Sequence, residues 1–226
     1  MFAHLGALNI ARDAVILDVG ANIGIFALSY ARLCSEGTVY AFEPHPGTFE
    51  ILVGNIALNR DLRDRVRPLN LGLSNAAGNA DISIPTAKIH SRYDTACHRL
   101  NSGLFSMHGD GVEKVTCRFV DLDGFMPDVP RLDLMKIDVE GSEYEVLEGA
   151  RRTIDRLRPV ITLEYNDLTR TLSRHDSRSF ETFFRSRGYR VFGLQYGWTR
   201  TQKPLDDLSA AGNVSDLVCV PDGRLG

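Results

Sequence analysis

Short apolar runs alternate with segments of helical periodicity along most of the chain, and this alternation restricts the fold more than any other feature. Ala14–Gly20, Thr38–Glu43 and Leu132–Val139 have the length and composition of buried strands. Between the first two, Ile23–Ser35 carries apolar residues at helical spacing. Strand–helix–strand units of this kind build an α/β fold with a mostly parallel sheet and helices on both faces. Further strands are expected at Val66–Ser74, Ala80–Ile84 (a hairpin or edge strand), Lys114–Val120, Pro159–Tyr165, Tyr189–Leu194 and Asp216–Val220.

Two helix starts have recognisable sequence signals. Pro46 suits the first position of the helix that follows the second strand. Ser142 and Glu145 form a capping-box pattern ahead of a helix expected to run to Leu157.

The totals are those of an ordinary globular domain. The chain has 226 residues, 43% of them apolar, and a net charge of −3. We therefore expect one domain over residues 1–226, and the charge gives no argument for a nucleic-acid partner. No run approaches the ~18 apolar residues of a membrane span, and no signal peptide opens the sequence. A cytoplasmic protein without a membrane partner is the expectation, and nothing argues against a homo-oligomer.

The pattern of strands and helices fades between Pro85 and Val112. Loops longer than about 12–15 residues inside a compact domain are usually functional or disordered. Residues 85–112 are therefore predicted to be an inserted lid or substrate loop.

A glycine-containing loop, Asp18-Val19-Gly20-Ala21-Asn22-Ile23-Gly24, follows the first strand. Ligands of such sheets bind beyond the carboxyl ends of the strands. Gly20 and Gly24 allow a sharp turn and a close ligand approach, and free amides at the helix start can receive a carboxylate. Asp18 can accept hydrogen bonds from a ligand ammonium. Asn22 stands where dinucleotide sites have a second glycine, which disfavours a pyrophosphate and a dehydrogenase. A tight turn that binds no ligand is the alternative.

Glu43 ends the second strand, at the same predicted edge of the sheet as the glycine loop. A carboxylate at this position can accept hydrogen bonds from both hydroxyls of a ribose. Taken alone, it could equally be a charge at a helix start. Together with the loop, it predicts a nucleoside ligand.

Three blocks of the sequence resemble the signature blocks of FkbM-type methyltransferases: LDVGANIGIFALSYA, YAFEPHPGTFEIL and LMKIDVEGSEYEVLEGA. The resemblance covers about Val15 to Asn166. It implies a Rossmann-like class I methyltransferase fold, with a seven-stranded sheet whose last strand is antiparallel. It also implies S-adenosylmethionine as methyl donor and commonly O-methylation in natural-product or glycan pathways. By position, the resemblance places the methionine part of the donor along Asp18, Gly20, Ala21, Asn22 and Gly24, its ribose on Glu43, and its adenine near Leu73 and Ser74.

Carboxylates also follow the fourth and fifth strands of the predicted sheet. Asp138 and Glu140 end one strand, on the same side as Lys136, and Glu164 ends the next. A hydroxyl is a poor nucleophile until its proton leaves, so Asp138, Glu140 and Glu164 are candidate catalytic groups beside the donor. The alternative is structural, with Lys136 neutralising a carboxylate and Glu140 serving the next helix N-terminus.

A metal site is a further hypothesis for the same edge. Asp138, Glu164 and Asn166 offer two carboxylates and an amide oxygen, a hard-oxygen set suited to Mg²⁺. Such an ion would lower the pKa of the acceptor hydroxyl.

The acceptor is expected to be a small molecule or a glycan. Transfer to nitrogen or carbon is the alternative within enzymes. A non-catalytic cofactor-binding module of the same fold is the alternative outside them.

Overall fold

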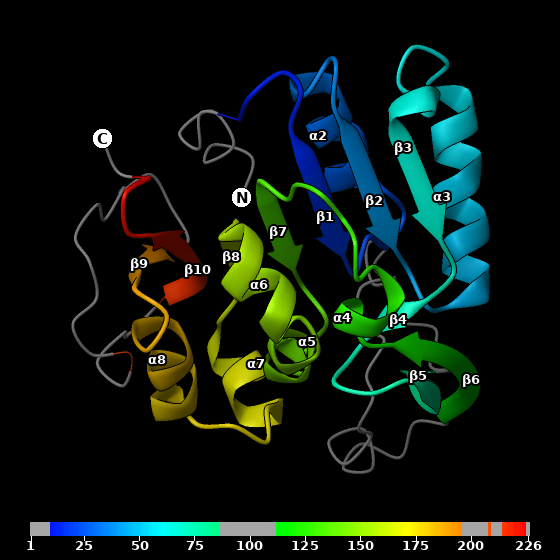
Figure 1. Ribbon diagram of the computed structural model, residues 1–226. Coiled ribbons are helices and arrows are strands. Elements are labelled where there is room, and N and C mark those ends of the chain that lie inside the picture. Colours follow the sequence, from blue (N-terminus) through cyan, green and yellow to red (C-terminus); the bar gives the residue numbers. More distant parts are fainter. Residues whose placement is uncertain (1–9, 86–111, 196–207, 209–213, 225–226) are drawn as a thin grey trace.

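The computed structural model describes residues 10–85, 112–195, 208 and 214–224. Seven strands form the main sheet: β1 (Val15–Val19), β2 (Thr38–Phe42), β3 (Val66–Leu69), β7 (Leu134–Ile137), β8 (Val160–Glu164), β9 (Tyr189–Gln195) and β10 (Val214–Pro221). Their order across the sheet is β3-β2-β1-β7-β8-β10-β9 (Figure 1). The pairs from β3 to β8 are all parallel, whereas β10 is antiparallel to both of its neighbours. The predicted fold, including the antiparallel last strand, is confirmed.

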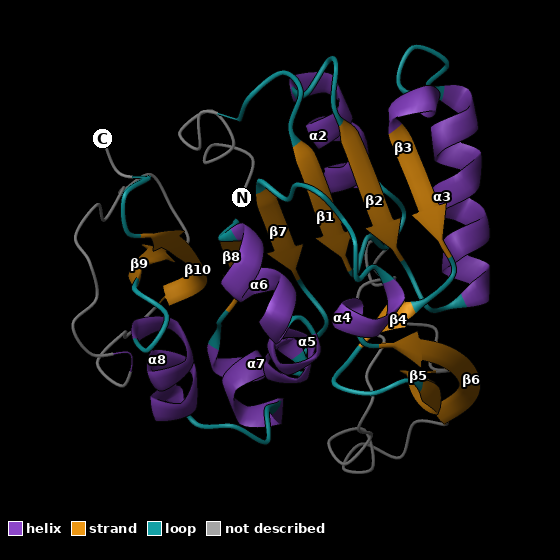
Figure 2. Cartoon of the chain, in the orientation of Figure 1, coloured by secondary structure: helices purple, strands orange, loops and turns teal. Residues whose placement is uncertain are grey.

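Helices cover both faces of this sheet (Figure 2). The layers are α2 (Ile25–Leu33) and α3 (Pro46–Leu58) on one face, and α5 (Glu143–Gly149), α6 (Arg151–Leu157) and α8 (Ser177–Arg185) on the other. Side chains alternate along β1, so that Leu17 packs in the α5–α8 layer while Ile16 packs in the α2–α3 layer. Because β1 is buried on both faces, its carboxyl end is a rigid platform for the loop that follows.

A second, three-stranded sheet lies at the carboxyl end of the main strands. Its strands are β4 (Gly72–Leu73), β5 (Gly78–Pro85) and β6 (Val112–Val120), in the order β4-β6-β5. β5 and β6 pair antiparallel with Pro85 opposite Val112, which confirms the predicted hairpin. Of the predicted lid at residues 85–112, all but the two end residues lie outside the described residues, so the lid stays a prediction.

Two local predictions are wrong. Val66–Ser74 is not one strand, because the chain leaves the main sheet after Leu69 and Gly72–Leu73 pairs with β6 instead. The helix expected from Ser142 to Leu157 is split at Ala150 into α5 and α6. Gly149 packs so tightly on the carbonyl of Ser74 that a Cβ there would lie 1.9 Å from its oxygen.

The capping box expected at Ser142 is also wrong. Ser142 is the N-cap residue of α5, but its side chain makes no capping hydrogen bond. The next residue, Glu143, binds backbone amides of the preceding turn instead. The Glu143 carboxylate at this helix start therefore stabilises the turn after β7.

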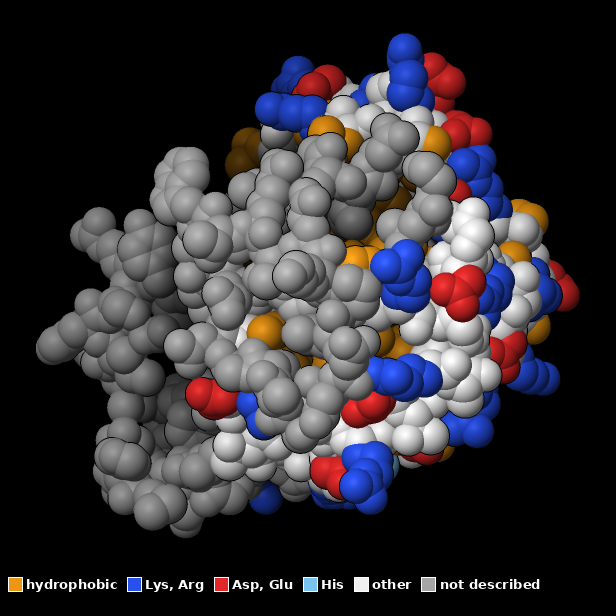
Figure 3. All heavy atoms as spheres, turned by 90° about the vertical axis from the view of Figure 1, so that its left-hand side faces the viewer, with side chains coloured by type: hydrophobic (Ala, Val, Ile, Leu, Met, Phe, Trp, Pro, Cys, Tyr) orange, Lys and Arg blue, Asp and Glu red, His pale blue; other side chains and the backbone are white. Residues whose placement is uncertain are grey.

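Charges of both signs are interspersed over the described part of the face in Figure 3. None of the described helices is long and apolar enough to cross a membrane. The expected cytoplasmic location, the homo-oligomer and the absence of a nucleic-acid partner stay predictions.

Candidate active site

The loop after β1 turns sharply and is held against the turn after β7. Gly20, Asn22 and Gly24 all have positive φ, of +75°, +51° and +92°. A Cβ on Gly20 would lie 1.9 Å from the carbonyl oxygen of Asp138. Only glycine permits this backbone angle together with so close an approach. The loop and the acidic residues after β7 therefore form one site.

The backbone amides of this loop are already engaged within the protein, so the predicted carboxylate contact is left to the start of the following helix. Gly20 and Ala21 both donate to the carbonyl oxygen of Phe42, at 3.0 and 2.9 Å. Gly24 donates to Ala21 at 2.9 Å. The amides of Asn22 and Ile23 donate to side-chain oxygens, those of Glu43 and Asn22, respectively. An incoming anion would instead meet the first turn of α2, whose initial amides have no partner within the helix.

Glu43 closes the loop from the side of β2. Its carboxylate accepts from the amide of Asn22 at 3.0 Å and from the amide of His45 at 2.9 Å. A carboxylate has about four acceptor positions, so two stay available for ligand hydroxyls. Burial raises the pKa of Glu43 to about 7, against the two amide hydrogen bonds, which favour the charged form. The geometry fits the predicted ribose contact and adds a second task, holding the loop.

Asn70 is a residue that the sequence interpretation missed. It follows β3, and its side-chain amide donates to the carbonyl oxygens of Glu43 and Pro44, at 2.9 and 3.0 Å. Asn70 thus fixes the backbone that presents the Glu43 carboxylate. An asparagine after a strand usually indicates a turn, so its sequence signal was weak.

Asp18 has a different partner from the ligand ammonium predicted for it. Its side chain is fully buried, and the ammonium of Lys136, also buried, lies 3.1 Å from its Oδ1. Lys136 also pairs with Asp138 at 3.3 Å and donates to the carbonyl oxygen of Gly20 at 3.0 Å. Lys136 therefore ties the loop after β1 to the turn after β7. The direct contact between Asp18 and a ligand stays a prediction.

The charge of Lys136 survives its burial. Burial lowers the pKa of an ammonium, but the carboxylates of Asp138 and Asp18 outweigh this effect and raise the pKa of Lys136 above its ordinary value. The alternative weighed for Lys136, that it neutralises a carboxylate, is what the structure shows.

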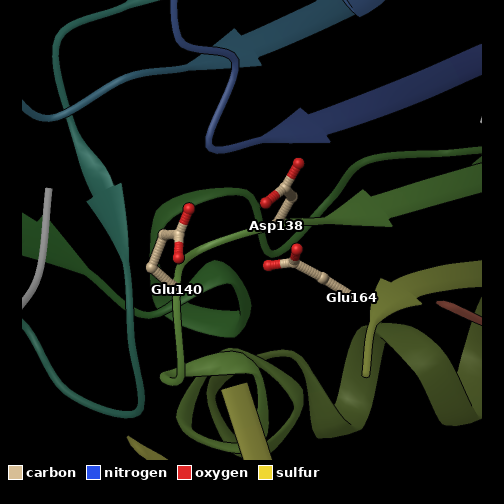
Figure 4. A group of neighbouring side chains, drawn as sticks. All are labelled: Asp138, Glu140 and Glu164. Carbon is tan, nitrogen blue, oxygen red and sulfur yellow. The ribbon is translucent and has the colours of Figure 1, made fainter. Parts of the chain in front are cut away.

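Three carboxylates converge beside this loop (Figure 4). One oxygen each from Asp138, Glu140 and Glu164 lie within 4.8 Å of one another. We call these three residues the acidic trio. The predicted metal set was different, since it had Asn166 in place of Glu140. Asn166 contacts the trio through its Nδ2, which donates to Glu164 at 2.7 Å, while its Oδ1 accepts from the amide of Thr169.

The turn that carries two members of the trio is held in an unusual conformation. Glu140 has φ +57° and Gly141 φ +103°. Glu143, almost fully buried, accepts from the amides of Val139 and Gly141, at 3.2 and 3.1 Å. Glu143 therefore stabilises the turn itself, and the alternative role considered for Glu140, a charge at the next helix N-terminus, stays a prediction. A non-glycine residue at positive φ costs about 1–3 kcal/mol, and such strain is concentrated at functional sites.

The carboxyl group of Glu164 has a strongly raised pKa. Burial raises its pKa to about 9, and the neighbouring carboxylates of Asp138 and Glu140 add to the rise. Its Oε2 is buried without a hydrogen-bond partner among the described residues. In the free protein at neutral pH, this carboxyl group therefore holds a proton. A positive charge brought beside it would lower its pKa.

Ser74 follows β4 rather than the third strand of the main sheet. Its amide donates to the carbonyl oxygen of Val120 at 3.0 Å. The neighbouring Leu73 is buried in the core. Asn70, and not Ser74, follows β3 and contacts Glu43. The predicted adenine contact of Ser74 stays a prediction.

Residues 18–191 match the methyltransferase FkbM domain, a range that includes the glycine loop, Glu43 and the acidic trio. The chain is 32% identical to methyltransferase sdnD of Sordaria araneosa over 62% of its length, and 32% identical to hexuronic acid methyltransferase AglP of Haloferax volcanii over 71%. It is 33% identical to the 31-O-demethyl-FK506 methyltransferase FkbM of Streptomyces tacrolimicus over 60%. The chain spans 62%, 62% and 58% of the lengths of these relatives, respectively.

The fold is also similar to that of a solved structure, methyltransferase FkbM from Methylobacillus flagellatus, with a TM-score of 0.61 and 16% identity. The alignment covers 95% of this chain and 45% of that protein. Together with the domain match over residues 18–191, these similarities establish that the chain belongs to the FkbM methyltransferase domain family.

Proposed function

We propose that this protein transfers a methyl group from S-adenosylmethionine to a hydroxyl oxygen of a small molecule or a sugar. One observation carries the proposal: Glu43 and the acidic trio flank the same glycine loop. Phe42 and Ile137, the residues before Glu43 and Asp138, both pair with Val19, the residue before Gly20. A nucleoside-binding carboxylate and a group of proton acceptors thus meet at one edge of the sheet.

The residues present fit the proposed cofactor. When bound, S-adenosylmethionine supplies a methyl group attached to a positively charged sulfur. The free acceptor positions of Glu43 suit the two ribose hydroxyls, and the first turn of α2 suits the carboxylate of the methionine part. Asp138, on the other side of the loop, lends negative charge near the positive group. We assign Asp18 and Lys136 to positioning, because their contacts shape the loop from within the core.

The acidic trio supports an oxygen acceptor. In transfer to a hydroxyl, the acceptor oxygen forms a bond to the methyl carbon, the carbon–sulfur bond breaks, and the hydroxyl proton must leave. Glu164 is our candidate for the proton acceptor, because its raised pKa and its buried Oε2, which has no hydrogen-bond partner among the described residues, make it a strong base once ionised. Asp138 forms an ion pair with Lys136 at 3.3 Å. The name of the Streptomyces relative, which specifies methylation at oxygen, also supports this acceptor type.

A labelled donor tests the proposal. The protein is incubated with methyl-deuterated S-adenosylmethionine and a panel of hydroxylated, amine and carbon acceptors, and products are identified by mass spectrometry. We expect deuterated methyl ethers, and a large loss of kcat in Glu164→Gln. Glu50→Gln, an exposed carboxylate on α3, is the matched control and is expected to keep full activity.

Three outcomes would contradict the proposal. Methylated amines in place of ethers, with full activity in Glu164→Gln, would identify an N-methyltransferase. Methylation at carbon alone would identify a C-methyltransferase. Tight cofactor binding without turnover of any acceptor would indicate a non-catalytic module.

The acidic trio is also a donor set that a divalent ion would accept, so Mg²⁺ stays a prediction for this edge of the sheet. A chelator separates the two uses of these carboxylates. Proton transfer to Glu164 predicts activity unchanged by the chelator. Activity lost to the chelator and restored by Mg²⁺ would assign the trio to an ion.

A further inference from the structure

A cavity of about 440 Å³ opens between the end of β8, α7 (Asp167–Leu172) and the start of α8. Glu164 and Glu143 belong to its lining, so the cavity reaches the acidic trio. Its volume lies near the lower end of the roughly 300–1,000 Å³ of small-molecule sites. That size suits one or two sugar rings better than a macrocycle.

Five residues of the cavity lining carry hydroxyl groups. They are Tyr165, Thr169, Thr171, Ser173 and Ser177. The hydroxyls of Thr169 and Thr171 donate to backbone carbonyl oxygens, at 3.1 and 2.7 Å. Because a hydroxyl that donates keeps its acceptor lone pairs, these side chains favour a ligand that brings its own donors.

Arg170 adds donors to the same cavity. Its side chain is largely buried, with its guanidinium 5.5 Å from the centroid of the Tyr165 ring. One of its nitrogens lies 3.4 Å from Asp167, which leaves further N–H groups of the guanidinium for a ligand oxygen. A ligand with many hydroxyls matches both kinds of lining, since each of its hydroxyls both donates and accepts.

Several acidic groups of the lining have partners within the protein. Asp167 pairs with Arg170, Asp176 caps α8 by accepting from the amide of Ser179, and Glu143 binds two backbone amides. Among the lining residues that the structure describes, four are acidic (Glu143, Glu164, Asp167 and Asp176) and two are basic (Arg170 and His175), which disfavours an anionic ligand. A neutral ligand is therefore favoured. Phe180 and Tyr165, whose rings meet edge to face, supply apolar surface for the carbon face of a ring.

We propose that the cavity between β8, α7 and α8 is the acceptor subsite, and that it takes a neutral sugar with one hydroxyl directed at Glu164. This inference rests on the proposed methyl transfer and names its substrate class. The sugar oxygen gains the methyl group as the carbon–sulfur bond breaks, and the hydroxyl proton passes to the Glu164 carboxylate. Arg170 binds the part of the sugar remote from the reacting hydroxyl.

Hydrogen exchange and kinetics test the subsite with neutral methyl glycosides as probes. With a bound glycoside, exchange should slow within residues 165–180, both with and without S-adenosylhomocysteine. Arg170→Met keeps the apolar stem and removes the donors, and we expect its KM for the glycoside to rise at least tenfold. Its affinity for S-adenosylmethionine should not change. Arg178→Met removes an exposed arginine from α8 outside the cavity, and it is expected to behave as the unmodified protein.

The outcomes distinguish this inference from the proposed function. Methyl transfer with an unaltered KM in Arg170→Met, or glycoside protection outside residues 165–180, would overturn the subsite and leave the methyltransferase intact. Stronger binding of methyl glucuronides than of neutral glycosides would overturn its substrate class. Absence of cofactor binding would overturn the proposed function, and exchange with glycoside alone would still decide whether the cavity binds sugar.

Discussion

Replacing Lys136 by methionine should destabilise the protein strongly, because it leaves a fully buried carboxylate without its cation. The ammonium lies 3.1 Å from Asp18 and 3.3 Å from Asp138. At an effective dielectric constant of about 20, two charges 3.1 Å apart attract each other by about 5 kcal/mol, and desolvation offsets part of this. Breaking a buried ion pair by removing one partner costs about 3–5 kcal/mol. Domains have about 5–15 kcal/mol of unfolding free energy, so Lys136→Met should lose a large share of it.

A double-variant cycle identifies the cause of this loss. Asp18→Asn removes the buried charge that Lys136 neutralises, so Lys136→Met should cost at least about 1 kcal/mol less in the Asp18→Asn background. Urea unfolding followed by circular dichroism gives the four free energies, with equal m-values as a check that unfolding stays two-state. A cost below about 1 kcal/mol for Lys136→Met, or strictly additive costs, would refute the central role given to this ion pair.

Three further predictions concern the loop and the buried carboxyls. Gly20→Ala should abolish cofactor binding and destabilise the protein, because its Cβ would lie 1.9 Å from the Asp138 oxygen, whereas Gly54→Ala, with open space on α3, should stabilise the protein by about 0.5–1 kcal/mol. Calorimetry measures cofactor binding and thermal unfolding measures stability. Tolerance of Gly20→Ala would contradict the geometry. Burial raises the pKa of Glu143 from 4.5 to about 7, so this carboxyl group ionises at lower pH in the unfolded state than in the folded state. The unfolding free energy should therefore fall by about 3 kcal/mol from pH 4 to 8. Urea unfolding of Glu143→Gln at several pH values should lack this fall. The kcat/KM of the unmodified protein should rise with pH toward about 9 as Glu164 ionises in the free enzyme, and an unchanged profile in Glu164→Gln would exclude Glu164 as the base.

Patterns local in sequence were enough to predict the sheet and the position of the site. Strand–helix alternation requires parallel strands, and parallel strands place their carboxyl ends at one edge. Asp18, Glu43, Asp138 and Glu164 could therefore be assigned to the same edge before any contact was known. The family resemblance added the antiparallel last strand, which alternation alone does not specify.

Contacts between segments distant in sequence explain what could not be predicted. The amides of Gly20 and Ala21 donate to the carbonyl oxygen of Phe42, more than 20 residues further along the chain. Glycine spacing and residue type indicate which backbone conformations and ligands are allowed. They do not indicate which group of the folded protein will form hydrogen bonds with a given amide. The split of α5 from α6 likewise accompanies the approach of Ser74 to Gly149, 75 residues further along the chain.

The central claim is that Glu43 binds the ribose of the cofactor. Isothermal titration calorimetry tests it most directly, with S-adenosylmethionine and S-adenosylhomocysteine titrated into the unmodified protein, Glu43→Gln and the control Glu50→Gln. A hydrogen bond to a charged group contributes about 1.5–3 kcal/mol, so we predict binding by the unmodified protein and by Glu50→Gln, and affinity roughly 10- to 100-fold weaker in Glu43→Gln. Absence of binding by the unmodified protein, or equal affinity in folded Glu43→Gln, would contradict the account.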